Sequence, residues 1–393
     1  MRKGLLITVI LLVSLLLVAQ TKLVIWCSEK QVDILQKLGE EYKAKRGVEV
    51  EVQQVDFGSI KSKFQNAAPA GQGADIIVGA HDWVGELAAN GLIEPIPQFD
   101  ELNMFYKTAL NAFSYGGKLY GLPYSMEAVA LIYNKKYVPE PPKLIEDLIE
   151  LAKEIDEEYE GDVRGFVYDV ANFYFSAPFI LGYGGYIFKE TESGLDVNDI
   201  GLANWGAIQG AKLIKRFFDE GILQPGDNYG VMDSLFLEDS AAMIINGPWA
   251  IKAYKDAGID YGVAPIPDLD WGVKAKPFVG VQGFMVNSKS PNKLIAMDFL
   301  TNFIAKKETL YKIFLADPRL PSRKDVLEMV KDDPDVTAFT QSAAAGTPMP
   351  NVPEMAPVWG AMGDALNLII NGEQTPEEAL KGAVEKIKAQ IQK

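Results

Sequence analysis

The sequence predicts an α/β protein made of two lobes. Short apolar runs alternate with amphipathic helical patterns from residue 23 onward, which is typical of strand–helix–strand units. A second series of such units begins near residue 144. The 393 residues, of which 48% are apolar, suffice for two ordinary hydrophobic cores. Because Cys27 is the single cysteine, the chain forms no internal disulfide, and packing must hold each lobe together.

The first unit begins with a continuous apolar run at residues 23–26, the pattern of a strand that is buried on both faces. Ser28 and Gln31 have the spacing of a capping box, which predicts a helix that starts there and ends at Gly47. Two further strands are predicted, at residues 48–52 and 74–78. This order of elements indicates a parallel sheet, and ligands of such sheets bind beyond the carboxyl ends of the strands.

Later segments predict the second series. Apolar residues recur at helical spacing around Leu148, and residues 241–245 have the composition of a buried strand. Thr375 and Glu378 form a capping box for the last helix. Two more strands are predicted before that helix, at residues 278–281 and 284–286.

The N-terminal segment has the layout of a secretory signal peptide. Arg2 and Lys3 precede an apolar run that ends at a small residue, so residues 1–19 are predicted to be cleaved off near Ala19. The run is shorter than the roughly 20 apolar residues of a spanning helix. A lipid-anchor cysteine would have to follow the run directly, whereas Cys27 lies further on. We therefore expect a periplasmic or secreted protein without a direct membrane anchor.

Charge and composition argue against several function classes. The formal net charge of −15 repels phosphate backbones, so nucleic acid is not an expected partner. His81 is the only histidine, so the chain cannot assemble a Cys/His zinc site or a dyad with a second histidine. The Gly-rich signatures of nucleotide sites are also missing. We expect no cofactor, metal or catalytic residue, although paired carboxylates leave a secreted glycosidase as the rival.

Aromatic side chains in turns are the positive signal. They lie at Trp83, Tyr174, Trp249 and Trp359. A sugar ring has an apolar C–H face and a rim of hydroxyls, so it suits an aromatic platform bordered by charged groups. Packing between the lobes is the alternative for each of these rings. Charged groups that could bond the hydroxyls lie at Glu29, Lys30, Asp82 and Glu127, and a local hydrogen-bond or packing role is expected for His81.

Several segments resemble the bacterial maltose/maltodextrin-binding proteins, the periplasmic solute-binding components of ABC importers. The most specific segments are Ile245-Asn246-Gly247-Pro248-Trp249 and Lys276-Pro277-Phe278-Val279-Gly280-Val281. The resemblance covers essentially the whole mature chain in order. It implies a two-lobed periplasmic-binding-protein fold of type II, with each lobe a doubly wound sheet that has helices on both faces.

The same resemblance implies how the chain divides. The N-terminal lobe would comprise residues 20–125 plus 281–330, and the C-terminal lobe residues 130–278 plus 333–393. Hinge segments would lie near residues 126–130, 277–281 and 330–334. A protein of this family would capture maltose or maltotriose by hinge closure and deliver it to the membrane permease subunits of an ABC importer, and a freely hinging clamp is expected to be a monomer.

The resemblance also assigns the site. The sugar would stack on Tyr174, Trp249 and Trp359, with polar contacts from Lys30, Asp82 and Glu127 and with Glu29 and Met349 close by. Several positions depart from the family pattern, namely Lys61, Ser62, Gly79, Trp83, Asn172, Gly360 and Gly363. These departures predict a roomier groove that favours a trisaccharide or longer, with Trp83 as a substitute platform and Asn172 at the site. Trehalose, another oligosaccharide or a polyol stays open as the ligand.

Overall fold

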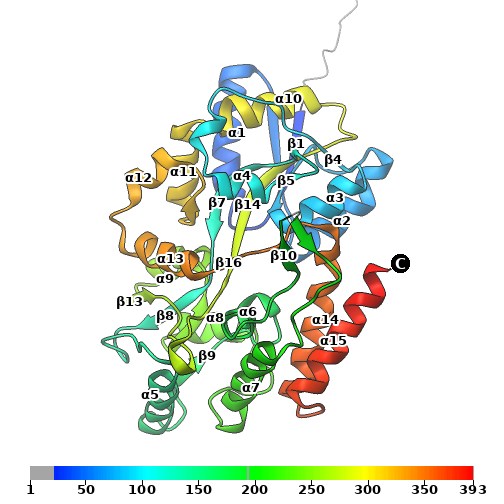
Figure 1. The fold of residues 1–393 in the computed structure, drawn as a ribbon. Coiled ribbons are helices and arrows are strands. Elements are labelled where there is room, and N and C mark those ends of the chain that lie inside the picture. Colours follow the sequence, from blue (N-terminus) through cyan, green and yellow to red (C-terminus); the bar gives the residue numbers. More distant parts are fainter. Residues whose placement is uncertain (1–21, 193, 393) are drawn as a thin grey trace, which may run out of the picture.

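The structure, a computed structural model, describes residues 22–192 and 194–392. The predicted signal peptide, residues 1–19, and its cleavage site near Ala19 lie outside the described residues. Two separate sheets organise the chain, one in the upper and one in the lower half of Figure 1. We call these halves the first lobe and the second lobe. Among the described residues, no helix combines the length and the apolar character that crossing a membrane requires.

The first-lobe sheet is mixed. Its strands run in the order β15 (Leu320–Pro321), β7 (Leu122–Glu127), β14 (Phe278–Asn287), β3 (Ile76–Ala80), β1 (Lys22–Cys27) and β2 (Glu49–Gln54), and β4 (Ile93–Glu94) and β16 (Thr347–Pro348) also pair with β14. Strands β1, β2 and β3 are parallel, as predicted. Strand β14 is antiparallel to both β3 and β7, so the parallel arrangement predicted from the first three strands holds for those strands but does not extend over the whole sheet. The reason is that β14 follows a second-lobe strand and enters from the opposite end.

Helices cover both faces of this sheet. Leu23, Ile25 and Cys27 of β1 enter the core formed with α1 (Val32–Arg46), η6 (Phe299–Ile304) and α11 (Lys307–Ala316). Trp26 enters the opposite core, formed with α2 (Phe57–Ala67), α3 (Val84–Ala89) and α4 (Lys107–Ala112). Burial on both faces explains why the sequence of β1 is continuously apolar. The remaining α-helices among the described residues of this lobe are α10 (Lys293–Asp298) and α12 (Lys324–Val330).

The start of α1 differs from the prediction. The helix begins at Val32, one turn after Ser28, and Gln31 at its N-cap makes no capping bond with its side chain. Ser28 Oγ instead donates to Gln31 Oε1 at 2.7 Å, and Gln31 Nε2 donates to Asp317 at 2.8 Å. The capping box was therefore wrong, because a buried polar network uses the Gln31 amide. The helix does end at Gly47, whose φ of 72° suits glycine.

The second-lobe sheet has the order β13 (Tyr261–Ala264), β8 (Ala130–Asn134), β12 (Ala241–Asn246) and β9 (Arg164–Val167). Its helices are α5 (Ile145–Glu158), α6 (Phe173–Gly182), α7 (Trp205–Asp219), α8 (Tyr229–Leu237), α9 (Ile251–Asp256), α13 (Pro334–Ala345), α14 (Ala356–Ile370) and α15 (Pro376–Ile391). The predicted capping box of α15 is confirmed by reciprocal bonds between Thr375 and Glu378. Two small hairpins complete the chain, β5 (Ser114–Tyr115) with β6 (Lys118–Leu119) and β10 (Lys189–Thr191) with β11 (Gly194–Asp196).

Three chain segments connect the lobes. Strand β7 of the first sheet ends at Glu127, and β8 of the second begins at Ala130. Strands β7 and β14 pair with each other down the middle of Figure 1, and the residues predicted as two strands at 278–281 and 284–286 form the single strand β14. Helix α12 ends at Val330, and α13 begins at Pro334. The expected hinges fall at these places, but their bending and the lobe boundaries stay predictions.

Candidate ligand-binding site between the sheets

The three aromatic residues predicted to stack on a ligand come together. Tyr174 lies 6.2 Å from Trp249 and 6.0 Å from Phe278 between ring centroids, and Phe278 lies 5.8 Å from Trp359. We call these four residues the aromatic cluster. Tyr174, Trp249 and Trp359 are each only partly buried, whereas Phe278 is buried at their centre. Phe278 was missed as a cluster member because the sequence marked it only as part of a strand.

Trp249 is held in place by its neighbours. It lies in the short helix η4 (Pro248–Ala250) directly after β12. A Cβ atom on Gly247 would lie 2.1 Å from the Trp249 ring, so glycine is required for the ring to pack on the backbone. Trp249 Nε1 donates to the Tyr229 hydroxyl at 3.2 Å. These two contacts fix the orientation of the ring before any ligand binds.

Tyr174 is positioned by the start of α6. Asn172 is the N-cap, and its side-chain oxygen accepts from the Tyr174 backbone N–H at 3.1 Å. This capping bond gives the exposed Asn172 a positioning role beside the cluster. The Tyr174 hydroxyl is enclosed and has no hydrogen-bond partner among the described residues. Burial raises the pKa of Tyr174 well above its usual value, so the hydroxyl keeps its proton and remains a donor.

Asp82 joins the first lobe to the cluster. It lies in η2 (His81–Trp83) at the carboxyl end of β3, where the sequence predicted it. Its carboxylate accepts from Trp359 Nε1 of α14 at 3.0 Å, which links the two lobes. Burial raises the pKa of Asp82, and the nearby His81 and Lys61 oppose that rise.

His81 has the local hydrogen-bond role that was expected. Its Nδ1 accepts from the Val281 backbone N–H at 3.0 Å, and its Nε2 lies 2.9 Å from the Met349 carbonyl oxygen. A backbone N–H can only donate and a carbonyl can only accept, so the ring is neutral with its proton on Nε2. Burial lowers the pKa of His81. The ring therefore connects β3, β14 and the segment before α14. The Met349 side chain itself is buried in the second-lobe core.

Trp83 does not join the aromatic cluster. Its side chain is 7% exposed and packs in the first-lobe core, where it lies 5.3 Å from the Phe57 ring. A Cβ atom on Gly79 would lie 2.0 Å from the Trp83 ring. The ring thus fills the space that a larger residue at position 79 would occupy. The packing alternative fits this geometry better than the substitute platform that the sequence suggested.

Glu29 and Lys30 lie just after β1 at the surface. Their charged groups approach each other at 3.9 Å, and the Glu29 side chain is exposed. Among the described residues, no hydrogen bond or ion pair joins either side chain to the aromatic cluster. The structure therefore leaves these two at the border of the candidate site.

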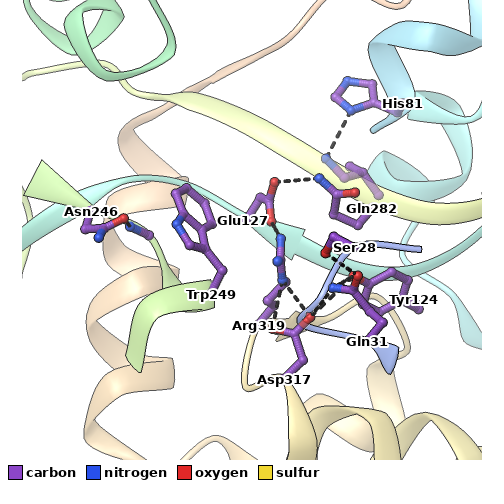
Figure 2. Close-up of polar contacts among 12 residues, drawn as sticks. Ser28, Gln31, His81, Tyr124, Glu127, Asn246, Trp249, Gln282, Asp317 and Arg319 are labelled. Carbon is purple, nitrogen blue, oxygen red and sulfur yellow. Dashed lines mark hydrogen bonds and ion pairs between the residues drawn. The ribbon is translucent and has the colours of Figure 1, made fainter. Parts of the chain in front are cut away.

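Glu127 is the centre of a buried polar network (Figure 2). Its Oε1 accepts from Gln282 Nε2 at 3.0 Å, and its Oε2 forms an ion pair with Arg319 Nη1. Arg319 Nε also donates to both Asp317 oxygens, at 3.0 and 2.9 Å. The Arg319 guanidinium lies 5.6 Å from the centre of the Trp249 ring. Sequence analysis missed Arg319 and Asp317, because the loop between α11 and β15 carries no recognisable motif.

The site combines flat aromatic faces with hydrogen-bonding groups whose charges are largely paired. That combination suits a neutral ligand with an apolar face and many hydroxyls. Among the described residues, no group of three or more His, Cys, Asp or Glu could hold a metal ion.

Residues 37–338 match the bacterial extracellular solute-binding proteins, and the chain belongs to this family. The two-lobed α/β architecture fits this membership. A maltotriose-binding protein of Pyrococcus abyssi is 35% identical over 367 residues, which cover 89% of this chain and 77% of the relative. A galactooligosaccharide-binding protein of Bacillus subtilis is 29% identical over 381 residues, covering 94% and 90%. A maltodextrin-binding protein of the same species is 29% identical over 332 residues, covering 82% and 79%. These findings confirm the resemblance inferred from the sequence motifs.

Proposed function

We propose that this protein captures a maltooligosaccharide between its lobes and delivers it to the permease subunits of an ABC importer. The observation that carries the proposal is the convergence of Tyr174, Trp249 and Trp359 beside the buried carboxylates Asp82 and Glu127. Aromatic faces stack on the C–H faces of glucose rings, and carboxylates accept from their hydroxyls. The maltotriose-, maltodextrin- and galactooligosaccharide-binding relatives agree with this ligand class.

We further propose that the preferred ligand has three or more sugar rings. A Cβ atom on Gly360 would meet nothing within 4 Å, and one on Gly363 would meet only the Ala171 carbonyl oxygen at 3.5 Å. Both glycines follow Trp359 on α14, so the helix leaves room for a further ring next to that tryptophan. Larger side chains at these positions would take up the same space.

Isothermal titration against maltose, maltotriose and maltotetraose tests both statements. We expect micromolar or tighter binding, with the trisaccharide or tetrasaccharide preferred over maltose. Tightest binding to maltose would contradict the proposal about length. Trehalose and a galactooligosaccharide are titrated alongside. Clearly tighter binding of either sugar would make that sugar, rather than a maltooligosaccharide, the proposed ligand.

Binding is proposed to work by closure of the lobes about the segments near residues 126–130, 277–281 and 330–334. A ligand that contacts both lobes favours the closed state by its differential affinity for it. The Asp82–Trp359 bond supports this mechanism because it joins a residue of the first lobe to one of the second. Small-angle scattering should show a more compact monomer with sugar than without it, and an unchanged radius of gyration would contradict closure.

The protein is proposed to leave the sugar chemically unchanged. Both candidate carboxylates are engaged, Glu127 by Arg319 and Gln282, and Asp82 by Trp359. A glycosidase needs one free nucleophile or base and one protonated acid across the scissile bond. A day-long incubation with maltotetraose should return the tetrasaccharide intact, and shortened products would restore the enzyme alternative.

Secretion with cleavage near Ala19 is the last part of the proposal. The extracellular character of the family supports it. Mass spectrometry of the protein recovered outside the cytoplasm should show a mature chain that begins close to residue 20.

A further inference from the structure

Arg319 lies in the candidate site, although no sequence motif predicted it there. It comes from the loop between α11 and β15 and reaches Glu127 at the end of β7. On its other side the guanidinium lies against Trp249 of the second lobe, 5.6 Å from the ring centre. Figure 2 shows the side chain among Glu127, Asp317 and Trp249. Arg319 thus contacts the stacking residue and the carboxylate that were both predicted to hold the sugar.

Arg319 keeps its positive charge although it is buried. The side chain is buried, with 7% of its surface exposed. Burial acts to lower the pKa of Arg319, but the carboxylates of Asp317 and Glu127 outweigh it and raise that pKa well above its usual value. A buried guanidinium with two carboxylate partners keeps one fixed geometry, because leaving either charge unpaired is costly.

One donor nitrogen of Arg319 is left over. Nε donates to Asp317 and Nη1 pairs with Glu127, whereas Nη2 has no hydrogen-bond partner among the described residues. Among the described residues, Ser125 Oγ and Tyr174 Oη are the fully enclosed polar side-chain atoms without a partner; Nη2 is not one of them, so it is not fully enclosed. Nη2 therefore keeps some exposed surface on a guanidinium whose central carbon lies 5.6 Å from the centre of the Trp249 ring.

We propose that Arg319 is a specificity-determining residue whose Nη2 donates to a hydroxyl oxygen of the sugar stacked on Trp249, while its Nη1 orients Glu127 to accept from a neighbouring hydroxyl. This inference rests on the proposed function. Donor and acceptor stand next to each other, so they match a sugar ring that offers two adjacent hydroxyls at the edge of the Trp249 ring. A ligand without those hydroxyls would leave Nη2 unpaired and would be selected against.

The test compares Arg319→Lys with the wild type on maltotriose and on a panel of its monodeoxy analogues. Lysine keeps the positive charge but lacks the planar guanidinium with its several N–H groups. It therefore cannot hydrogen-bond to both carboxylates and to a sugar hydroxyl in the same geometry. In the wild type, at least one analogue should bind roughly tenfold or more weakly than maltotriose. The variant should bind maltotriose roughly tenfold more weakly and should show no further loss for that same analogue.

Arg323→Lys is the matched control. Arg323 is similarly buried and pairs with the two carboxylates of Glu101 and Asp325, and among the described residues no hydrogen bond, ion pair or cation–π contact joins it to the aromatic cluster. It should bind maltotriose and all analogues as the wild type does. Thermal unfolding shows whether Arg319→Lys folds. If it does not, a double variant that carries Arg319→Gln and Glu127→Gln, and so removes one positive and one negative charge together, is titrated on the same panel.

The outcomes separate this inference from the proposed function. Wild-type protein that binds no maltooligosaccharide refutes the proposed function itself. Wild-type protein that binds every monodeoxy analogue within twofold of maltotriose overturns the inference alone, whatever the variants do. An Arg319→Lys variant that retains wild-type affinity, or that weakens all analogues by one common factor, also overturns it, because a purely structural role predicts such uniform behaviour.

Discussion

Replacement of Trp249 by alanine should remove one stacking face from the site. A tryptophan side chain buries ~150–250 Å² when it is covered. One face of Trp249 already lies on Gly247 and Arg319 lies 5.6 Å from the ring centre, so a sugar gains at most about half of that area. At ~25 cal/mol per Å², the stacked half corresponds to about 2–3 kcal/mol, or roughly 30- to 150-fold in Kd. We expect maltotriose to bind Trp249→Ala more weakly by this factor.

Folding of the Trp249→Ala protein should remain nearly intact. The ring is only partly buried, and its one side-chain hydrogen bond among the described residues is to Tyr229. The melting temperature should therefore fall by a few degrees at most. Isothermal titration and thermal unfolding on the same sample measure both quantities. Trp205→Ala is the control, since Trp205 is 67% exposed, lies on α7 and stacks on Trp271, which is not a residue of the cluster. Unchanged affinity combined with a collapsed melting temperature would assign Trp249 to the core and refute the stacking argument.

Three further outcomes are expected. Gly79→Ala should cost about 1–3 kcal/mol in urea unfolding because its Cβ would lie 2.0 Å from the Trp83 ring, whereas Gly360→Ala, with nothing within 4 Å, should not. The folded-state pKa of His81 is lowered, so below about pH 6.5 the unfolded state binds more protons than the folded state. The free energy of unfolding should therefore fall as pH drops below that value, and a His81→Asn protein should lack this loss. The pKa of Asp82 is raised, so ionised Asp82 lowers the free energy of unfolding at pH 7. Asp82→Asn should therefore unfold at a higher urea concentration than the wild type at pH 7, and the difference should shrink as pH falls. The same variant should bind sugar more weakly.

Local patterns in the sequence were enough to predict most elements. The continuous run of β1, the glycine that ends α1 and the capping box of α15 each depend on a few adjacent residues. The aromatic cluster was also predictable in outline. Tyr174 and Trp249 lie in the turns that begin α6 and follow β12, and Trp359 lies near the start of α14, so their rings are presented at element ends.

Contacts between distant segments were not predictable in this way. Gln31 has the right spacing for a capping box, yet its side chain bonds Asp317, 286 residues away. Arg319 pairs with Glu127 across 192 residues, and nothing near Arg319 in the sequence marks it. Trp83 was expected as a platform, but Gly79 four residues earlier leaves a space that the ring fills. Each of these outcomes depends on where the fold places a second segment.

The enclosed Tyr174 hydroxyl gives a physical reason why closure should depend on ligand. An enclosed polar group without a partner costs about 1–3 kcal/mol. In an open form that hydroxyl can bond water, so closure without sugar carries this cost in full. Because the hydroxyl is enclosed in this structure, a sugar oxygen can accept from it only after displacing a neighbouring group. Such a bond removes the cost in the closed form only, which is the differential affinity that closure requires. Tyr174→Phe should accordingly close more readily without sugar while losing affinity for it, and scattering of the unliganded variant against wild type measures the first effect. A variant that stays as open as wild type would show that the enclosed hydroxyl does not oppose closure.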